Sequence, residues 1–470
     1  MQKRTTDVVI LGGGTAGMGA YRAAKAQTER VILIEDHHFG TTCARVGCMP
    51  SKLLIAAAEA AEHARHTAPF GVHVDGDIRI NGQEVMQRVK SERDRFVGFV
   101  LESVDEFPAE DKILGKARFI DAHTIQVDDH TQITAERIVI ATGSRTNMAP
   151  YRDAWADLGD RLIINDDVFA WDDLPKSVAV FGPGVIGLEL GQALHRLGVD
   201  VTLFGASGRV GPLTDPKLMT EAQKIFKSEL KAHLKSKDAQ FTRRGDQVEI
   251  SFKSDEGQAE TITVDYVLAA IGRRPNVDNI GLENLDIQLD ERGVPVADHK
   301  TMQTSLAHIF IAGDASNQLA LLHEAADQGR IAGHNAGIYP NTEAGLRRSL
   351  LSVVFSDPQI ALIGDTHRTL SERFKDSDRL VVGEVSFENQ GRSRVMLVNK
   401  GRLHVYADKH TGLFLGAEMI GPRAEHIAHL LAWSHQQGMT LAQMLDMPFY
   451  HPVIEEGVRT ALRDALRQVD

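Results

Sequence analysis

The chain contains very little cysteine. Its 470 residues include only two cysteines, Cys43 and Cys48, and three tryptophans. Two cysteines cannot build the disulfide framework of a secreted domain or a zinc site made of four cysteines, and we expect no metal site. No apolar run approaches the roughly 18 residues that a membrane-spanning helix needs. Glycines 12–14 interrupt the N-terminal apolar run too early for a signal peptide, so we expect a cytoplasmic protein without a membrane partner.

The chain also lacks an excess of positive charge. Lysine and arginine number 52 against 64 aspartates and glutamates, which gives a net charge of −12. A general nucleic-acid binder would show a basic face, so we expect no nucleic-acid partner. The length is too great for one hydrophobic core and predicts about three domains.

The two cysteines lie close together, in Cys43-Ala44-Arg45-Val46-Gly47-Cys48. In an ideal helix, residues five apart have Cα atoms roughly 8.6 Å from each other, whereas a disulfide needs less than about 7 Å. The segment must therefore distort, and Gly47 supplies the freedom. Cys48 precedes a predicted helix whose dipole favours a thiolate, and Lys52 adds a cation one turn later. This pattern predicts a redox pair; the alternative is two buried structural cysteines.

A glycine pattern occurs twice, 170 residues apart. In each copy a predicted buried strand, 7–10 or 177–180, runs into Gly-x-Gly-x-x-Gly and then a helix and a second strand. The first glycine permits a tight turn, the second lets the backbone approach a pyrophosphate, and the third lets helix and strand pack closely. The repeat predicts two nucleotide sites, although a single copy could be only a glycine-rich turn. The glycines are Gly12, Gly14 and Gly17, and Gly182, Gly184 and Gly187.

The two copies differ at the end of the second strand. Glu35 stands where a carboxylate can hold the hydroxyls of a ribose, and Gly205 is its counterpart. The second site therefore lacks the acid typical of NAD sites. This also removes the repulsion against a 2′-phosphate, and Arg209 lies close by, so NAD is expected and NADP is allowed.

Later segments predict the domain organisation. Apolar strands end in Thr142-Gly143-Ser144, in Gly272 and in Gly313-Asp314. Beyond residue 349 the pattern changes to antiparallel strands with amphipathic helices over 425–437 and 452–467. We predict a first nucleotide domain from residues 1–150 and 278–345, a second from 151–277, and a C-terminal domain from 346–470.

Taken together, these motifs resemble the class I pyridine nucleotide-disulfide oxidoreductases over essentially the whole chain. Pro50-Ser51-Lys52 is most similar to dihydrolipoamide dehydrogenases, of which this chain would be a divergent branch. The resemblance implies an α/β fold with two Rossmann-like, glutathione reductase-type domains, one for FAD and one for NAD(P). It also implies a C-terminal α+β domain that forms a homodimer.

The resemblance assigns roles to individual residues. Cys43 would exchange with the substrate, Cys48 would lie next to the flavin, and Lys52 would lie near the flavin N5 and pair with Glu189. By itself, Glu189 would be taken for a solvated helix charge. The implied FAD contacts are Gly12, Gly14, Gly17, Glu35, Thr42, Lys52, Gly115, Ala117, Thr142, Gly143, Ser144, Asp314, Leu322 and His323. The implied NAD(P) contacts are Gly182, Gly184, Ile186, Gly187, Glu189 and Gly272.

The C-terminal His-Pro supplies a candidate base. Pro452 suits the first turn of a helix, which would place His451 where that helix begins. Glu456 matches the acid that orients the histidine in the family, and Glu455 is the alternative if the helix register differs. A carboxylate fixes the tautomer and stabilises the imidazolium. In the family this pair reaches the active site of the other subunit, which implies a homodimer with a shared site.

Three departures from the family pattern concern the substrate. Gly40-Thr41-Thr42 replaces Gly-Gly-Thr, Arg45 lies between the cysteines, and Val453 follows His451-Pro452. A guanidinium beside the pair should favour thiolates and raise the oxidising power of the disulfide. The Ser-Lys pair is unlike glutathione reductases. Mercuric and large thioredoxin reductases carry a C-terminal redox pair that this chain lacks.

The function implied is electron transfer between NAD(H), flavin, the Cys43–Cys48 disulfide and a small dithiol or a lipoyl domain. Oxidation of dihydrolipoamide by NAD⁺ is the best specific interpretation. One alternative is another NAD(P)H-dependent disulfide or metal-ion reductase of the same family. A different class is a redox-sensing flavoprotein that binds a partner without turnover, but a pure binder has no need of both cysteines and the histidine–acid pair.

Overall fold

The computed structural model describes all residues from 1 to 470 and divides them into two compact units. Unit 1 comprises Met1–Leu53, Gln87–Asn147 and Gly272–Arg347, and unit 2 comprises Leu54–Met86, Met148–Ile271 and Arg348–Asp470. The three domains predicted above group the chain differently and remain a prediction. No helix is long and apolar enough to cross a membrane.

Unit 1 is built on a seven-stranded sheet with the strand order β3-β2-β1-β6-β5-β4, in which β17 also pairs with β6. The first β-α-β unit is parallel, and the β4-β5-β6 meander is antiparallel. The strands are β1 (Gln2–Leu11), β2 (Val31–Glu35), β3 (Lys112–Leu114), β4 (Ala117–Asp121), β5 (Thr124–Val127), β6 (Thr131–Ile140) and β17 (Ile309–Ile311).

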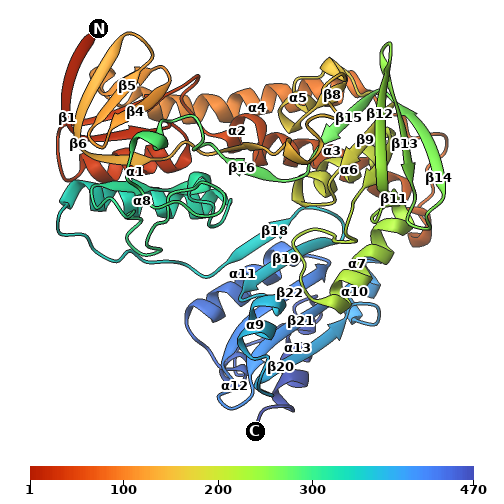
Figure 1. Cartoon of the computed structure of the whole chain (residues 1–470). Helices are drawn as coiled ribbons and strands as arrows, with labels where there is room; N and C mark the ends of the chain where they lie inside the picture. Colours follow the sequence, from red (N-terminus) through yellow and green to blue (C-terminus); the bar gives the residue numbers. More distant parts are fainter. The chain divides into compact units, whose positions relative to one another are not determined.

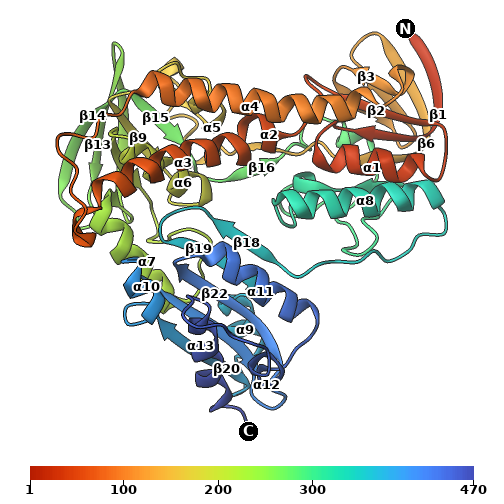
Figure 2. The same ribbon diagram turned by 180° about the vertical axis from the view of Figure 1, so that it is seen from behind.

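Strand β1 is buried on both of its faces. Val8 and Ile10 enter one apolar core and Val9 and Leu11 enter another, because successive side chains of a strand point to opposite sides. On one side, helices α1 (Thr15–Lys25) and α8 (Leu322–Ile338) run side by side (Figures 1 and 2). A Cβ atom on Gly333 of α8 would lie 2.1 Å from the Ala20 carbonyl oxygen, so glycine permits this close approach.

Unit 2 contains a parallel five-stranded sheet with the order β11-β10-β9-β15-β8. Its β9-α6-β10 unit repeats the β1-α1-β2 unit of unit 1, as the sequence repeat predicts. The strands are β8 (Leu162–Ile163), β9 (Ser177–Phe181), β10 (Asp200–Phe204), β11 (Lys231–His233) and β15 (Tyr266–Ala269). The helices are α5 (Asn165–Val168), α6 (Val185–Arg196) and α7 (Pro216–Glu229), beside an antiparallel sheet of β12 (Lys237–Arg244), β13 (Gln247–Lys253) and β14 (Ala259–Val264).

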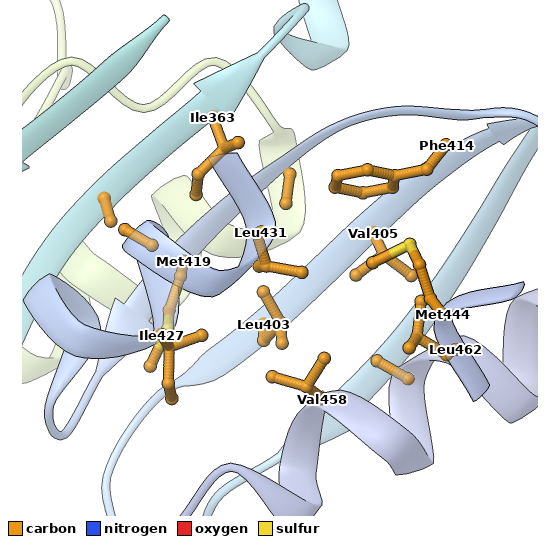
Figure 3. Close-up of a cluster of buried hydrophobic side chains, with 14 of the residues drawn as sticks. Ile363, Leu403, Val405, Phe414, Met419, Ile427, Leu431, Met444, Val458 and Leu462 are labelled. Carbon is orange, nitrogen blue, oxygen red and sulfur yellow. The ribbon is translucent and has the colours of Figure 1, made fainter. Parts of the chain in front are cut away.

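The C-terminal part of unit 2 is an antiparallel sheet with the order β18-β19-β22-β21-β20. Leu403 and Val405 of β21 pack with Leu431 and Val458 from two helices in one buried cluster (Figure 3). The strands are β18 (Leu351–Val354), β19 (Gln359–Gly364), β20 (Leu380–Ser386), β21 (Arg402–Asp408) and β22 (Phe414–Gly421). The helices are α9 (His367–Arg373), α10 (Gly391–Val395), α11 (Ala424–Gln436), α12 (Leu441–Leu445) and α13 (Glu456–Leu466).

The remaining elements include three helices near the cysteines. The division between the two units falls within both α3 and α4. The helices are α2 (Thr42–Val46), α3 (Cys48–Arg65) and α4 (Gly82–Asp105), and β7 (Ser144–Thr146) pairs with β16 (Arg273–Pro275). Short 3-10 helices are η1 (Ala68–Phe70), η2 (Ala109–Asp111), η3 (Ala149–Tyr151), η4 (Gly159–Arg161), η5 (Leu282–Asn284) and η6 (Gly313–Ser316).

The last helix begins later than the sequence predicts. The expectation that Pro452 occupies a first helical turn is wrong, because α13 begins at Glu456. Residues 451–455 form turns, and the Glu456 carboxylate closes them by accepting hydrogen bonds from His451 Nδ1 (3.0 Å) and Val453 N (3.4 Å).

Candidate active site

The first glycine turn has the geometry that a pyrophosphate site requires. Gly12 has a φ of +108°, and a Cβ atom there would lie 2.3 Å from the Ala141 carbonyl oxygen. A Cβ atom on Gly17 would lie 1.7 Å from the Gly12 oxygen, so α1 touches the turn. A Cβ atom on Gly14 would meet nothing within 4 Å, which leaves the backbone open to a ligand.

The second glycine turn repeats this geometry. Gly182 has a φ of +110°, and a Cβ atom on Gly187 would lie 1.9 Å from the Gly182 oxygen. Gly184 again faces open space. Ile186 is half-buried in the first turn of α6. Each turn thus closes tightly at two glycines and stays open at the one between them.

Both helices that follow the turns begin without a capping side chain. Gly14 and Gly184 are the N-caps of α1 and α6, and no acidic residue occupies either first turn. The first amide groups of a helix have no partner within the helix, and the helix dipole adds partial positive charge there. Each helix therefore presents donors to an anion at its open glycine.

Glu35 ends β2 beside the first turn. Its Oε2 accepts a hydrogen bond from the backbone N–H of Gly13 at 2.6 Å, and its Oε1 accepts one from His37 at 3.2 Å. The Gly115 N–H donates to the Glu35 carbonyl oxygen at 2.9 Å, which extends the pairing of β2 with β3 by one residue, and Ala117 begins β4 two residues later. The carboxylate is thereby held at the edge of the turn.

Among the buried polar atoms of unit 1 that form no hydrogen bond within the chain are Thr142 Oγ1 and His323 Nε2. A buried polar atom without a hydrogen bond is costly, so both atoms fit a bound polar group. His323 follows the exposed Leu322 at the start of α8, and Thr142 precedes Gly143, which has a φ of +70°. Both residues are among the predicted FAD contacts, and their chemistry fits that cofactor.

A polar network that the sequence analysis missed holds Asp314. Ser144 Oγ donates to Asp314 Oδ2 at 2.6 Å, and Arg273 Nε donates to Ser144 Oγ at 2.8 Å. Ser144 lies in β7, Arg273 in the paired strand β16, and Asp314 in η6. No sequence pattern indicates this contact, because Ser144 is 129 positions from Arg273 and 170 positions from Asp314.

Gly47 separates the two cysteines, as expected. Its φ of −127° and ψ of −117° are not helical, so α2 ends before it and Cys48 is the first residue of α3. Cys43 is half-buried and Cys48 is exposed. The hydrogen bond with Cys48 and burial raise the pKa of the Cys43 thiol, while the positive charge of Lys52 opposes the shift. The dithiol is therefore close enough for the two sulfurs to exchange a proton.

The residues flanking the pair are ordered by the loop before it. Thr41 caps α2 by accepting a hydrogen bond from Ala44 N at 3.1 Å, which leaves Thr42 exposed as the first helical residue. Arg45 Nη2 donates to the Phe39 carbonyl oxygen at 3.3 Å. The positive charge of Lys52 favours a lower pKa for the Cys43 thiol.

His451 and Glu456 lie together, as predicted. A carboxylate only accepts, so His451 Nδ1 carries the proton of their 3.0 Å hydrogen bond and Nε2 is left as a base. The imidazole is exposed, with 82 % of its side-chain surface accessible, whereas Glu456 is mostly covered. The bond from His451 lowers the pKa of Glu456, and Arg459 supports it at 2.8 Å. Glu455 occupies the N-cap position of α13, and its side chain forms no capping hydrogen bond.

Glu189 is not the solvated charge that its position in the sequence suggests. It is 4 % exposed on α6, and its Oε1 accepts a hydrogen bond from the Phe355 N–H at 3.0 Å. Lys52 belongs to unit 1 and Glu189 to unit 2, so their pairing stays a prediction. Gly272 lies between β15 and β16 with a φ of +107°, and a Cβ atom there would meet open space.

A buried polar cluster in unit 2 has no counterpart in the sequence analysis. Asp215 accepts hydrogen bonds from His404 Nδ1 at 2.8 Å and from the Tyr406 hydroxyl at 3.2 Å. Burial favours a higher pKa for Asp215, but the bond and charge of His404 outweigh it and lower this pKa to about 2. The neighbouring Glu418 is fully buried and accepts hydrogen bonds from the backbone of Thr214 and Asp215. These contacts tie the start of α7 to the C-terminal sheet.

Family models match nearly the whole chain. Residues 6–329 match the pyridine nucleotide-disulphide oxidoreductases, and residues 350–462 match the dimerisation domain of the same family. The dihydrolipoyl dehydrogenase of Geobacillus stearothermophilus is 29 % identical over 467 residues, covering 98 % of this chain and 96 % of the relative. The dihydrolipoyl dehydrogenase of Bacillus subtilis is 30 % identical over 488 residues, covering 97 % of each chain.

Solved structures support the fold. The HOCl-induced flavoprotein disulfide reductase RclA from Escherichia coli, solved as a Cu(II) complex, superposes with a TM-score of 0.79 at 24 % identity. The match covers 98 % of this chain and 99 % of RclA. Because the family models match residues 6–329 and 350–462, the chain belongs to the pyridine nucleotide-disulphide oxidoreductases, flavoproteins that use FAD and NAD(P)H.

Proposed function

We propose that this chain oxidises dihydrolipoamide with NAD⁺, through FAD and a redox disulfide formed by Cys43 and Cys48. The observation that carries the proposal is the pair itself: the thiols of Cys43 in α2 and Cys48 at the start of α3 are in hydrogen-bond contact near the Lys52 charge. Curated relatives over the full length are dihydrolipoyl dehydrogenases, which supports this dithiol as the substrate. The cytoplasmic location expected from the sequence stays a prediction.

The first glycine turn would hold the FAD pyrophosphate at the N-terminus of α1, with Glu35 on the ribose. Thr142 and His323 would donate to or accept from the cofactor through atoms that lack partners within the chain. Asp314, held by Ser144, would contact the sugar-like hydroxyls. The second turn, with Gly272 and Glu189, would hold the nicotinamide coenzyme. Bound FAD would supply a two-electron acceptor between the dithiol and NAD⁺.

The chain's own residues would handle thiols and protons. His451 Nε2 takes a proton from a substrate thiol, and the resulting thiolate attacks Cys43 of the disulfide while Cys48 leaves as a thiolate. The second substrate thiol then attacks the substrate sulfur of the mixed disulfide, and its proton passes through His451 to Cys43, which leaves as a thiol and releases the oxidised substrate. Two electrons thereby reach the pair, and Lys52 favours the thiolate form.

We further propose a homodimer in which His451 and Glu456 of one subunit serve the cysteines of the other. The exposed imidazole, which meets no sulfur in the chain's own unit 2, supports a target outside that unit. The match of residues 350–462 to the family's dimerisation domain supports the assembly. Sedimentation should therefore give a dimer. Mixing the inactive variants Cys43→Ser and His451→Gln should restore part of the activity, because one mixed site is intact.

An anaerobic titration tests the redox pair. One equivalent of NADH per flavin should produce a long-wavelength absorbance band, and Cys48→Ser should abolish it. His451→Gln should lose lipoamide turnover while flavin reduction by NADH continues. If the wild-type protein gives no band, the redox role of the pair is wrong; if His451→Gln keeps lipoamide turnover, the base is another group.

Metal-ion reduction by the same dithiol is a second candidate. RclA has been solved as a Cu(II) complex. No group of three or more histidine, cysteine, aspartate or glutamate side chains is placed to hold a metal ion here, so a metal substrate would meet the two thiols. Thiolates favour soft ions such as Cu(I). Turnover of lipoamide, glutathione disulfide and Cu(II) should be compared, and Cu(II) reduction without lipoamide turnover would favour this candidate.

A further inference from the structure

The loop that follows the second strand is closed in the same way in both nucleotide turns. In the first copy, Gly40 N–H donates to the Gly13 carbonyl oxygen at 3.2 Å. In the second copy, Gly211 N–H donates to the Pro183 carbonyl oxygen at 2.7 Å. Residues 36–39 and 206–210 are therefore equivalent loops beside the ribose position, and the second is one residue longer.

Pro183 and Gly205 occupy the positions in the second copy that Gly13 and Glu35 occupy in the first. In the first copy the Gly13 N–H anchors the Glu35 carboxylate at 2.6 Å. Pro183 has no N–H to donate. A Cβ atom on Gly205 would lie 2.9 Å from Pro183 Cγ and 3.0 Å from the Leu234 oxygen. A carboxylate at position 205 would thus lack a hydrogen-bond donor and would collide with Pro183 and Leu234. The packing around Gly205 therefore excludes an acidic side chain.

The charges around the second loop are positive. Residues 206–210 contain no acid and one base, the exposed Arg209. Lys235 lies over the same loop, because a Cβ atom on Gly208 would come within 2.9 Å of Lys235 Cε. Neither side chain forms an ion pair within the chain.

Asp255 lies beside Lys235 of this loop region, and its charge is compensated. Asp255 receives the Lys227 ammonium at 2.6 Å and the backbone N–H of Lys235 at 2.7 Å. These hydrogen bonds and the Lys227 charge outweigh burial and lower the pKa of Asp255. The loop therefore keeps a net positive potential from Arg209 and the Lys235 side chain.

We infer that the second turn accepts a phosphate on the 2′-oxygen of the adenosine ribose, so that NADPH serves this chain at least as well as NADH. The inference rests on the proposed assignment of this turn to the nicotinamide coenzyme. A carboxylate in this position holds the two ribose hydroxyls of NAD and repels a 2′-phosphate. Here the 2′-hydroxyl loses its acceptor, and a 2′-phosphate meets two cations instead.

Binding of adenosine fragments tests the inference without turnover. Calorimetry on the FAD-loaded protein should show adenosine 2′,5′-bisphosphate binding about 10-fold or more tightly than 5′-AMP at low salt. The difference should shrink as salt is added, because both cations are exposed. Equal binding, or tighter binding of 5′-AMP, would overturn the inference.

Substitutions test the two cations. The double variant Arg209→Gln, Lys235→Gln should lose the preference for the bisphosphate and keep its affinity for 5′-AMP within about 2-fold. Lys231→Gln is the control for the loss of one lysine charge, because it removes a lysine from the other end of the β11 segment. If the control weakens bisphosphate binding as much as the double variant, the assignment of Arg209 and Lys235 fails.

The reverse change tests the packing argument. Pro183→Gly together with Gly205→Glu rebuilds the arrangement of the first copy and should shift flavin reduction from NADPH toward NADH. In the wild type, anaerobic flavin reduction should be at least as efficient with NADPH as with NADH. More efficient flavin reduction by NADH than by NADPH would refute the inference. Both half-reactions omit the dithiol, so a protein that reduces its flavin with NADPH but ignores lipoamide would refute only the proposed substrate.

Discussion

Replacing Gly14 with alanine should separate flavin binding from folding. A Cβ atom at this position meets no atom within 4 Å, so the variant can fold with the glycine turn intact. The same methyl group would point into the space through which a pyrophosphate approaches the first amides of α1. Gly14→Ala should therefore yield a folded protein that lacks most of its flavin.

The size of both effects follows from the contacts. Alanine is a poorer N-cap than glycine, which should cost at most about 1 kcal/mol and lower Tm by a few degrees. Loss of one or two hydrogen bonds from backbone amides to a charged phosphate costs about 1.5–3 kcal/mol each. The affinity for FAD should fall by about 10- to 10⁴-fold. Gly17→Ala differs, because its Cβ atom would lie 1.7 Å from the Gly12 oxygen and the variant should not fold.

The internal repeat supplies the matched control. Gly184→Ala makes the same change in the second turn, where the added Cβ atom also meets nothing within 4 Å. It should retain FAD and lose flavin reduction by either nicotinamide coenzyme. Flavin absorbance per chain, fluorescence quenching on FAD titration and stopped-flow reduction measure these outcomes. A Gly14→Ala protein with a full complement of FAD would refute the argument that the open glycine is where the cofactor approaches.

Three further predictions concern single contacts. Glu456→Gln should lower dithiol turnover by about 10²-fold, because His451 loses the carboxylate that orients its ring, while flavin reduction by coenzyme stays unchanged in stopped flow. Asp215→Asn should destabilise the fold by about 2 kcal/mol at neutral pH. Folding lowers the pKa of Asp215 from 3.8 to about 2, so the wild type has this stability above pH 4 and loses it as the pH falls toward 2. The urea midpoint of the variant should therefore change less with pH than that of the wild type, and the same pH dependence in both proteins would contradict the argument. Ser144→Ala should weaken FAD binding about 10-fold by leaving Asp314 without its hydrogen bond. An unchanged affinity for FAD would show that the hydrogen bond between Ser144 and Asp314 does not support FAD binding.

The features predictable from sequence are those set by neighbouring residues. The glycine turns are local, because the positive φ of Gly12 and the close approach of Gly17 to the Gly12 oxygen both occur within one strand-turn-helix segment. Gly47 likewise breaks the helix between two cysteines in its own vicinity. The histidine–acid contact was predictable because it spans five residues, although Pro452 suggested a helix that begins only at Glu456.

Contacts between distant segments were not predictable in the same way. Glu189 reads as a surface charge from its helix alone, and it is buried because the Phe355 amide, 166 positions away, reaches its carboxylate. Asp215 is the N-cap of α7, which is a local contact. Its low pKa depends instead on His404 from a strand of the C-terminal sheet. In each case the partner is chosen by the packing of whole sheets, for which a single sequence holds no local signal.

The cysteine pair illustrates how placement changes an electrostatic argument. Arg45 lies between the cysteines in the sequence and was expected to favour their thiolates. Its guanidinium instead donates to the Phe39 carbonyl oxygen, which fixes the loop leading into α2. Lys52 is farther along the chain, but four residues of helix from Cys48 bring it onto the same face of α3. Its charge is the one that opposes the raised pKa of Cys43. Helical periodicity therefore brings the positive charge of Lys52 from α3 to the redox pair, although Arg45 lies closer to Cys43 in the sequence.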